Sequence, residues 1–403
     1  MATVVLLGTL DTKGAEYGYL RDRLLEQGVE VLLVDAGVFE PQIHADVGQE
    51  EVAGAAGADL AALREGGDRG AAVEAMCRGA AEVVRRLHAE GRLDGFLCVG
   101  GSGNSSIGAA AARALPVGVP KLIVSTVASG DTRPYMGATD VSMTYSVVDI
   151  SGLNRISERI LSNAAGAIAG MAKVRVPESG EGRKLIGATM FGVTTPAVTR
   201  ARERLEELGY EVLVFHATGT GGQSMEALAR DGFLAGVLDV TTTELADELV
   251  GGVLSAGPDR LEAAGASGVP QVVSLGALDM VNFGPRESVP ERFEGRNLYV
   301  HNPTITLMRT TPDECRELGR RIGRKLSDAK GPTALFVPLK GVSMIATEGQ
   351  PFHDPDADAA LLDGLRETLG DDVEVHELDT DVNDEAFALA MADRLDEMIR
   401  EAR

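Results

Sequence analysis

The sequence contains no tryptophan, and aromatic residues make up only 4 % of its 403 positions. A core with so few rings has to be built from Ala, Val, Leu and Ile, which suits helices packed on parallel strands. Cysteine is also scarce, because Cys77, Cys98 and Cys315 lie far apart and form no CxxC pair. Their odd number and wide spacing exclude a disulfide framework and a zinc site of the CxxC type, and they favour a reducing compartment.

Long apolar runs and an excess of basic residues are absent as well. No stretch of about 18 apolar residues is present, so we expect no membrane-spanning helix. The first residues open directly into a strand pattern without a basic and apolar leader, and we therefore expect a cytoplasmic protein. The 38 Lys and Arg residues face 61 Asp and Glu residues, which gives a net charge of −23. Such a surface repels nucleic acid and anionic membranes, so neither is an expected partner.

What is present is a regular alternation of short apolar runs with longer helical patterns. This βαβ order predicts an α/β protein with parallel, doubly wound sheets. In the first part of the chain the expected strands are 3–8, 29–35, 95–100, 121–125 and 141–147, and the expected helices are 15–27, 50–64, 71–90, 105–115 and 154–173.

A polar segment rich in Gly and Pro, residues 177–183, interrupts the alternation, and the pattern then begins again. We therefore expect two Rossmann-like domains, residues 1–176 and 184–403, with a cleft between them. Later in the second domain we expect strands at 298–301, 334–338 and 373–377, and helices at 312–327, 357–369 and 385–400.

The restart resembles the beginning of the chain. Leu6-Leu-Gly-Thr9 corresponds to Leu185-Ile-Gly-Ala188, and Pro120-Lys-Leu-Ile-Val-Ser125 corresponds to Pro270-Gln-Val-Val-Ser274. These matches fall in the same order at comparable spacing, so we infer a tandem duplication of one α/β unit. The alternative is that any two Rossmann-like halves share a strand–Gly–helix rhythm for physical reasons alone.

Ligands of open parallel sheets bind outside the carboxyl ends of the strands, so the segments that follow each strand are the candidates. Gly100-Gly-Ser-Gly-Asn-Ser-Ser106 offers flexible backbone, polar donors and the N-terminus of the next helix to an anion. It lacks the GK[ST] ending of a Walker A loop and is a loose relative of GxGxxG. The alternative is a tight strand–helix turn with a Ser cap. The predicted phosphate-binding residues are Gly8, Thr9, Asp11, Thr12, Lys13, Gly100, Gly101, Ser102, Gly103, Asn104, Ser105, Ser106, Ser129 and Gly130.

Charged residues near these segments suggest more specific roles. Lys13 is placed to meet a phosphate, and Asp11 and Asp131 are the candidate ligands of a magnesium ion. For Asp11 and Lys13 the alternative is the solvated start of a helix.

Polar segments also follow the expected strands of the second domain, and three of the six histidines of the chain fall there. Each has a structural alternative, such as Thr243 or Asp354 capping a helix, or a histidine satisfying backbone groups. The acidic run 354–358 has a calcium-loop spacing but lacks the Gly and Glu that such a loop needs at its sixth and twelfth places. The predicted substrate-binding or catalytic residues are Asp239, Glu244, His301, Arg309, Lys340 and His353.

Four segments together, 8–13, 100–106, 301–304 and 340–355, resemble the ATP-binding family typified by the N-terminal region of the tomato mosaic virus resistance protein. The resemblance implies two Rossmann-like subdomains, ATP bound on the first, and a homodimer. The plant chain continues into a TIM-barrel-like domain, so the resemblance implies that this domain is here either missing or a separately encoded partner. The plant member binds a viral replication protein, a specialised role that need not transfer.

Three functions are compatible with these observations. The leading hypothesis is an ATP- and Mg²⁺-dependent transferase, ligase or hydrolase acting on a small anionic metabolite that Arg309 and Lys340 would bind. The second is a nucleotide-responsive binding module without turnover. The third is a dinucleotide-dependent enzyme, with Ser106 in the last motif place and Asp35 near the end of the second strand.

Overall fold

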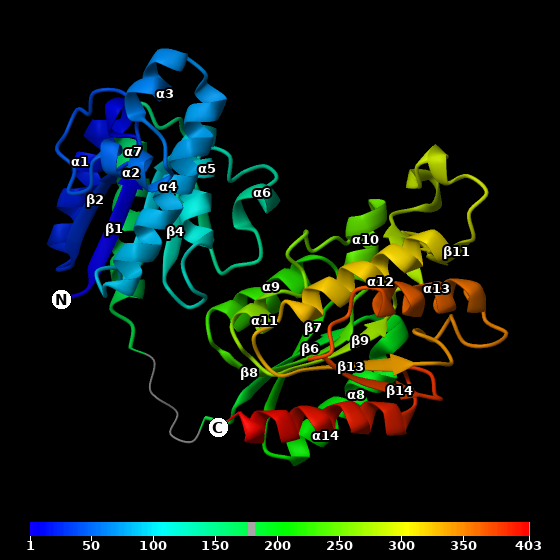
Figure 1. Ribbon diagram of the computed structural model, residues 1–403. Coiled ribbons are helices and arrows are strands. Elements are labelled where there is room, and N and C mark those ends of the chain that lie inside the picture. The colour runs from blue at the N-terminus through cyan, green and yellow to red at the C-terminus, as the bar shows by residue number, and fades with distance from the viewer. Residues whose placement is uncertain (176–181, 403) are drawn as a thin grey trace. The chain divides into compact units, whose positions relative to one another are not determined.

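The computed structural model describes residues 1–175 and 182–402, and the chain divides into two compact units, 1–178 and 179–403 (Figure 1). We refer to them as unit 1 and unit 2. Most of the expected break at 177–183 lies outside the described residues.

Unit 1 is built on a parallel sheet of five strands in the order β2-β1-β3-β4-β5. Gly8 is in register with Asp35, and Gly100 is in register with Ser125, so four carboxyl ends meet at one edge of the sheet. The strands are β1 (Thr3–Gly8), β2 (Glu30–Asp35), β3 (Gly95–Gly100), β4 (Lys121–Ser125) and β5 (Ser142–Tyr145).

Helices cover both faces of this sheet, which explains why its strands read as almost continuous apolar runs. Val5 and Leu7 pack with residues of α2, α4 and α5, whereas Val4 and Leu6 pack with residues of α1 and α7. The predicted doubly wound architecture is therefore confirmed. The helices are α1 (Leu10–Glu26), α2 (Gln49–Ala55), α3 (Leu60–Gly66), α4 (Arg69–Ala89), α5 (Ser102–Arg113), α6 (Arg133–Met136) and α7 (Arg155–Ala172).

Unit 2 has a parallel sheet of six strands in the order β14-β13-β9-β8-β6-β7. Read from β7, this is the order of unit 1 with one strand added, which supports the predicted duplication. Its strands are β6 (Leu185–Met190), β7 (Glu211–His216), β8 (Leu234–Thr241), β9 (Gln271–Gly276), β13 (Thr333–Pro338) and β14 (Glu374–Leu378).

Two layers of helices enclose the second sheet as well. Helices α8 and α14 pack on one face, and the remaining helices pack on the other (Figure 1). The helices are α8 (Thr195–Glu207), α9 (Thr220–Arg230), α10 (Glu244–Val250), α11 (Ala263–Ala266), α12 (Pro312–Ser327), α13 (Pro355–Arg366) and α14 (Glu385–Glu401).

A small antiparallel sheet, in the order β10-β12-β11, is inserted between β9 and α12. The expected strand at 298–301 exists as β11 (Leu298–Asn302), but it belongs to this sheet and not to the parallel one. It pairs with the central strand β12 (Ile305–Arg309), whose other side pairs with the short strand β10 (Met280–Phe283).

Several helix boundaries differ from the sequence prediction. The helix expected at 50–64 is two helices, because Gly57 has φ +68° and Asp59 caps α3 by accepting a hydrogen bond from Ala62 N at 2.8 Å. Helices α1 and α5 begin at Leu10 and Ser102, earlier than expected. Most of the expected loop 100–106 is therefore the first turn of α5. No helix among the described residues is long and apolar enough to cross a membrane.

Candidate functional site

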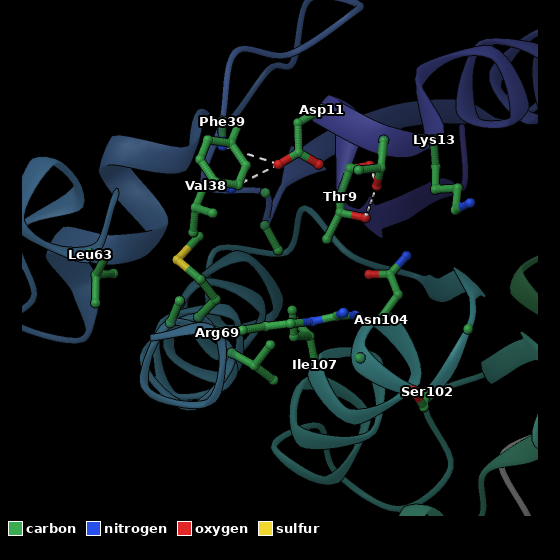
Figure 2. Close-up of a pocket in the computed structure, with 18 of the residues that line it drawn as sticks. Thr9, Asp11, Lys13, Val38, Phe39, Leu63, Arg69, Ser102, Asn104 and Ile107 are labelled. Carbon is green, nitrogen blue, oxygen red and sulfur yellow. Dashed lines mark hydrogen bonds between the residues drawn. The ribbon is translucent and has the colours of Figure 1, made fainter. Parts of the chain in front are cut away.

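A cavity of about 570 Å³ opens in unit 1 at the carboxyl ends of β1, β2 and β3 (Figure 2). Its lining includes residues 9 and 11–13, 36–39 and 101–104, which directly follow these three strands. Strands β1 and β3 are neighbours whose onward connections run to opposite sides of the sheet. The cavity therefore lies at the topological switch point, where open α/β sheets bind ligands.

The N-terminus of α5 faces this cavity with space around its first turn. Gly101 is the N-cap and has no side chain to satisfy the first N–H groups of the helix. A Cβ atom at Gly103 would have only Arg69 Nη2 within 4 Å, at 3.7 Å, and one at Gly101 would have only Thr126 Oγ1, at 3.8 Å. An anion can therefore approach the backbone here, as at other helix N-termini.

Ser102 is exposed and lines the cavity, whereas the next three side chains along the chain form hydrogen bonds within the fold. Asn104 donates to Val99 O at 2.6 Å, Ser105 shares a 2.6 Å hydrogen bond with Ser125, and Ser106 donates to Ser102 O. Two predicted glycines have steric roles. A Cβ at Gly100 would lie 2.5 Å from the Cβ of Asn104, and one at Gly8 would overlap the ring of Tyr17.

The segment 9–13 contributes the first turn of α1 to the cavity. Asp11 Oδ2 accepts hydrogen bonds from the backbone N–H groups of Val38 and Phe39 at 3.2 and 3.0 Å (Figure 2). Its Oδ1 is buried without a hydrogen-bond partner among the described residues. The Lys13 ammonium donates to the carbonyl of Ile150, and Thr9 and Thr12 share a hydrogen bond of 3.0 Å. Asp11 thus holds the β2 loop and keeps one oxygen free.

The predicted Ser129, Gly130 and Asp131 do not belong to this site. All three are exposed on the segment after β4, and none lines the cavity. Asp131 is instead paired with Arg133 at 2.7 and 2.9 Å, and the hydrogen bonds from Arg133 lower the pKa of Asp131 to about 2. Its carboxylate thus already has a cationic partner outside the cavity, and its expected role as a magnesium ligand stays a prediction.

Sequence reasoning missed one side of the cavity, which comes from α3 and the start of α4. Arg69 reaches from α4 towards the first turn of α5, and it has no hydrogen-bond or ion-pair partner in the described part of the chain (Figure 2). Val38, Leu63 and Met76 form an apolar wall beside it. The turn Gly66-Gly67-Asp68-Arg69 is a visible signal, but it joins two helices and does not follow a strand.

Asp239 and Glu244, predicted to face a substrate in the second domain, are buried in an ionic cluster with Arg260. Arg260 donates to Glu244 Oε2 at 2.7 Å and to Asp239 Oδ1 at 2.7 Å. Burial by itself lowers the pKa of Arg260, but Asp239 and Glu244 outweigh it, so the net shift is upward and the guanidinium stays charged. Because both carboxylates are at most 1 % exposed, they cannot reach a ligand at the surface.

Arg309 and His301 also differ from expectation. Arg309 is buried and donates to Asp358 Oδ1 at 2.7 Å and to Phe352 O at 2.8 Å, so its donors stabilise the loop before α13. His301 is exposed on β11 of the small antiparallel sheet. The donors of Arg309 are therefore used within the fold, and His301 lies at the surface of a different sheet from Asp239.

Lys340 and His353 do come together, in a second cavity of about 570 Å³ within unit 2. The Lys340 ammonium pairs with Asp379 at 2.8 Å. The alternative role for Asp354 is confirmed, since its side chain caps α13 by accepting from Ala357 N at 3.1 Å. The six predicted residues of the second domain are therefore not one site.

The chain is similar to proteins from bacteria and a plant. A UPF0261 protein of Clostridium tetani is 54 % identical over 98 % of both chains, and one of Rhizobium meliloti is 48 % identical over 97 % of both. The ToMV resistance protein Tm-1 of Solanum lycopersicum is 45 % identical over 78 % of this chain and 43 % of its own length. Among solved structures, UDP-GlcNAc 2-epimerase from Neisseria meningitidis is 10 % identical over 68 % of this chain and 82 % of its own, with a TM-score of 0.22.

The resemblance to the tomato protein that the sequence motifs suggested is thus confirmed. Residues 2–177 match the N-terminal domain of the uncharacterised protein family UPF0261, and residues 183–399 match its C-terminal domain. Since the two matches together span nearly the whole sequence, this chain belongs to the UPF0261 family.

Proposed function

We propose that unit 1 binds ATP with Mg²⁺ in the cavity at the carboxyl ends of β1, β2 and β3. The observation that carries the proposal is the meeting of three features there: the open N-terminus of α5, the unpartnered guanidinium of Arg69, and an apolar wall. Helix N-termini and Arg side chains are the groups with which proteins hold phosphates. In a chain of net charge −23, such local donors have to provide the attraction.

The apolar wall suits the base of a nucleotide. Val38, Leu63 and Met76 lie on the β2 loop, α3 and α4, and their side chains offer van der Waals contact to a flat ring. The resemblance to the ATP-binding family favours adenine among the possible bases. The triphosphate would extend from this wall to Arg69 and the first turn of α5.

A magnesium ion fits this site only together with phosphate. Among the described residues no group of three or more His, Cys, Asp or Glu side chains could hold a metal. Asp11 offers one carboxylate oxygen without a partner, and Mg²⁺ is commonly held by one or two carboxylates, substrate phosphates and water. Asp11 would therefore be its protein ligand.

The site supports a mononucleotide better than a dinucleotide. In NAD-binding folds an acidic residue near the end of the second strand accepts hydrogen bonds from the ribose. Asp35 occupies that place, but it is 1 % exposed, and its Oδ1 accepts from Leu10 N and Gly37 N at 3.0 and 2.8 Å. Asp35 is buried at the edge of the sheet and does not line the cavity.

Calorimetry of the full chain with ATP, NAD and adenosine in the presence of Mg²⁺ tests the proposal. We expect ATP to bind more tightly than the other two, and Gly103→Val to abolish ATP binding because the new side chain would occupy the open space before α5. Gly54→Val is the matched control, since Gly54 is an exposed helical glycine with no atom near its Cβ position. Equal ATP affinity in the Gly103→Val variant would refute the site.

ATP turnover separates an ATP-dependent enzyme from a nucleotide-responsive binding module. Hydrolysis that requires an added metabolite would support the enzyme, and tight binding without turnover would support the module. The homodimer and the separately encoded TIM-barrel partner stay predictions, which size-exclusion chromatography with light scattering and co-purification would test.

A further inference from the structure

We infer that unit 2 carries a second ligand site, which takes a small organic cation with an apolar body. The site is the cavity of about 570 Å³ at the carboxyl ends of β9 and β13, beside the first turns of α13. It is independent of the proposed nucleotide site, because it lies in the other unit and has its own lining.

The floor of this cavity is apolar and rigid. Leu275, Val342 and Leu361 line it, and each is at most 4 % exposed. All three also belong to the core of unit 2, so packing beneath the cavity fixes their positions. These side chains offer a ligand only van der Waals contact, and a ligand that fills the cavity must therefore have an apolar part.

The polar side of the cavity carries more negative than positive charge. Its lining contains three carboxylates, Glu348, Asp358 and Asp381, and one ammonium, Lys340, so with His353 neutral the sum is −2. Ion pairs do not change this balance. Arg309 beside Asp358 adds one positive charge, and the partner of Lys340 adds one negative charge.

Two of the carboxylates are available to a ligand. Glu348 is exposed on the loop after β13, and it has no hydrogen-bond or ion-pair partner within the described residues. Asp381 follows β14 and uses Oδ1 to accept from Asn383 N at 2.8 Å, which leaves Oδ2 open. An ammonium or guanidinium group finds acceptors here, whereas the anionic metabolite expected from the sequence would be repelled.

A charge series of matched ligands tests this site. Hexylammonium, hexanol and hexanoate have the same apolar chain, and their binding to the full chain can be followed by saturation-transfer NMR. We expect hexylammonium to bind at least fivefold more tightly than hexanoate. Stronger binding of hexanoate, or no binding of hexylammonium, would overturn the inference.

Variants locate the binding. Asp381→Asn keeps an oxygen for Asn383 N, and Glu348→Gln changes an exposed side chain, so both should fold. Each should weaken hexylammonium by about fivefold, the effect of removing one charge near the surface, and leave hexanol unchanged. Glu211→Gln, at the amino end of β7, is the matched control and should change nothing. If both cavity variants bound hexylammonium as tightly as the unaltered protein does, the assignment would be overturned.

The same samples separate this site from the nucleotide site. Asp381→Asn should retain ATP affinity, and Gly103→Val should retain hexylammonium affinity. If ATP did not bind, the proposed nucleotide site would be refuted, but the hexylammonium result would still test the cavity of unit 2. Loss of hexylammonium binding in the Gly103→Val variant would overturn the assignment to unit 2.

Discussion

Arg69 provides the sharpest test of the nucleotide site. It is the first residue of α4, its side chain is exposed, and it makes no hydrogen bond or ion pair within the described residues. Its guanidinium lies beside the first turn of α5, with Nη2 3.7 Å from the place of a Cβ on Gly103. The Arg69→Met substitution should therefore leave the fold intact and remove one cation from the proposed phosphate position.

The magnitude follows from the kind of contact that is lost. A hydrogen bond to a charged group contributes about 1.5–3 kcal/mol, so ATP should bind about 10- to 150-fold more weakly. Adenosine has no phosphate, and its affinity should not change.

Calorimetry with ATP, ADP and adenosine at fixed ionic strength measures both effects. The matched control is Arg78→Met, because Arg78 is an exposed residue of the same helix, paired with Glu74 at 2.6 Å, and its loss changes the net charge equally. Similar loss of ATP affinity in both variants would mean that only overall charge matters. A parallel loss of adenosine binding in Arg69→Met would mean that the side chain contacts the base or supports the fold. Either result refutes the assignment.

Three further substitutions test other parts of the chain. Asp11→Asn keeps an acceptor for the β2 loop but removes the charge, so ATP affinity measured by calorimetry should no longer increase with Mg²⁺; a persistent increase contradicts its role. Arg260→Met leaves buried carboxylates unpaired and should lower the free energy of unfolding by about 3–5 kcal/mol in urea titrations, against little change for the surface variant Arg202→Met; equal effects contradict the cluster's role. Burial raises the pKa of Asp247 to about 7, above its unfolded value, so its stabilising contribution is complete below about pH 4 and is lost as pH rises through 7. Between these pH values Asp247 should make the free energy of unfolding fall by up to about 1.4 kcal/mol per pH unit, and Asp247→Asn should remove that fall. An unchanged slope of unfolding free energy against pH contradicts the assignment.

The parallel sheets could be predicted because strands buried on both faces are almost uniformly apolar. The antiparallel insertion could not, because its strands are short and carry buried polar residues. Asn282 on β10 donates to the buried Asp247 at 2.7 Å, and Thr306 on β12 is fully buried. Such residues resemble loop residues until their partners from distant segments are known.

The candidate site was predictable only where it follows strands. Residues 9–13 and 101–104 directly follow β1 and β3, so their meeting follows from the parallel topology. Arg69 comes from a turn between helices, which no strand pattern marks. The opposite error concerned Asp239, whose place at a strand end suggested a ligand contact. Its neutralising partner Arg260 lies 21 residues away, and the sequence alone does not show that their side chains meet.

The two units differ at the switch point of the same strand order. In unit 1 the segment after β3 starts α5 with small residues and leaves its N-terminus open. In unit 2 the corresponding segment after β8 is Thr242-Thr243-Glu244, all fully buried. The Glu244 carboxylate accepts from Gly219 N and Gly222 N at 2.7 and 3.0 Å and pairs with Arg260, so the protein itself supplies the anion that this switch point favours. With the switch point of unit 2 filled in this way, the cation site that we propose lies elsewhere along the same edge, in the acidic cavity at β9 and β13.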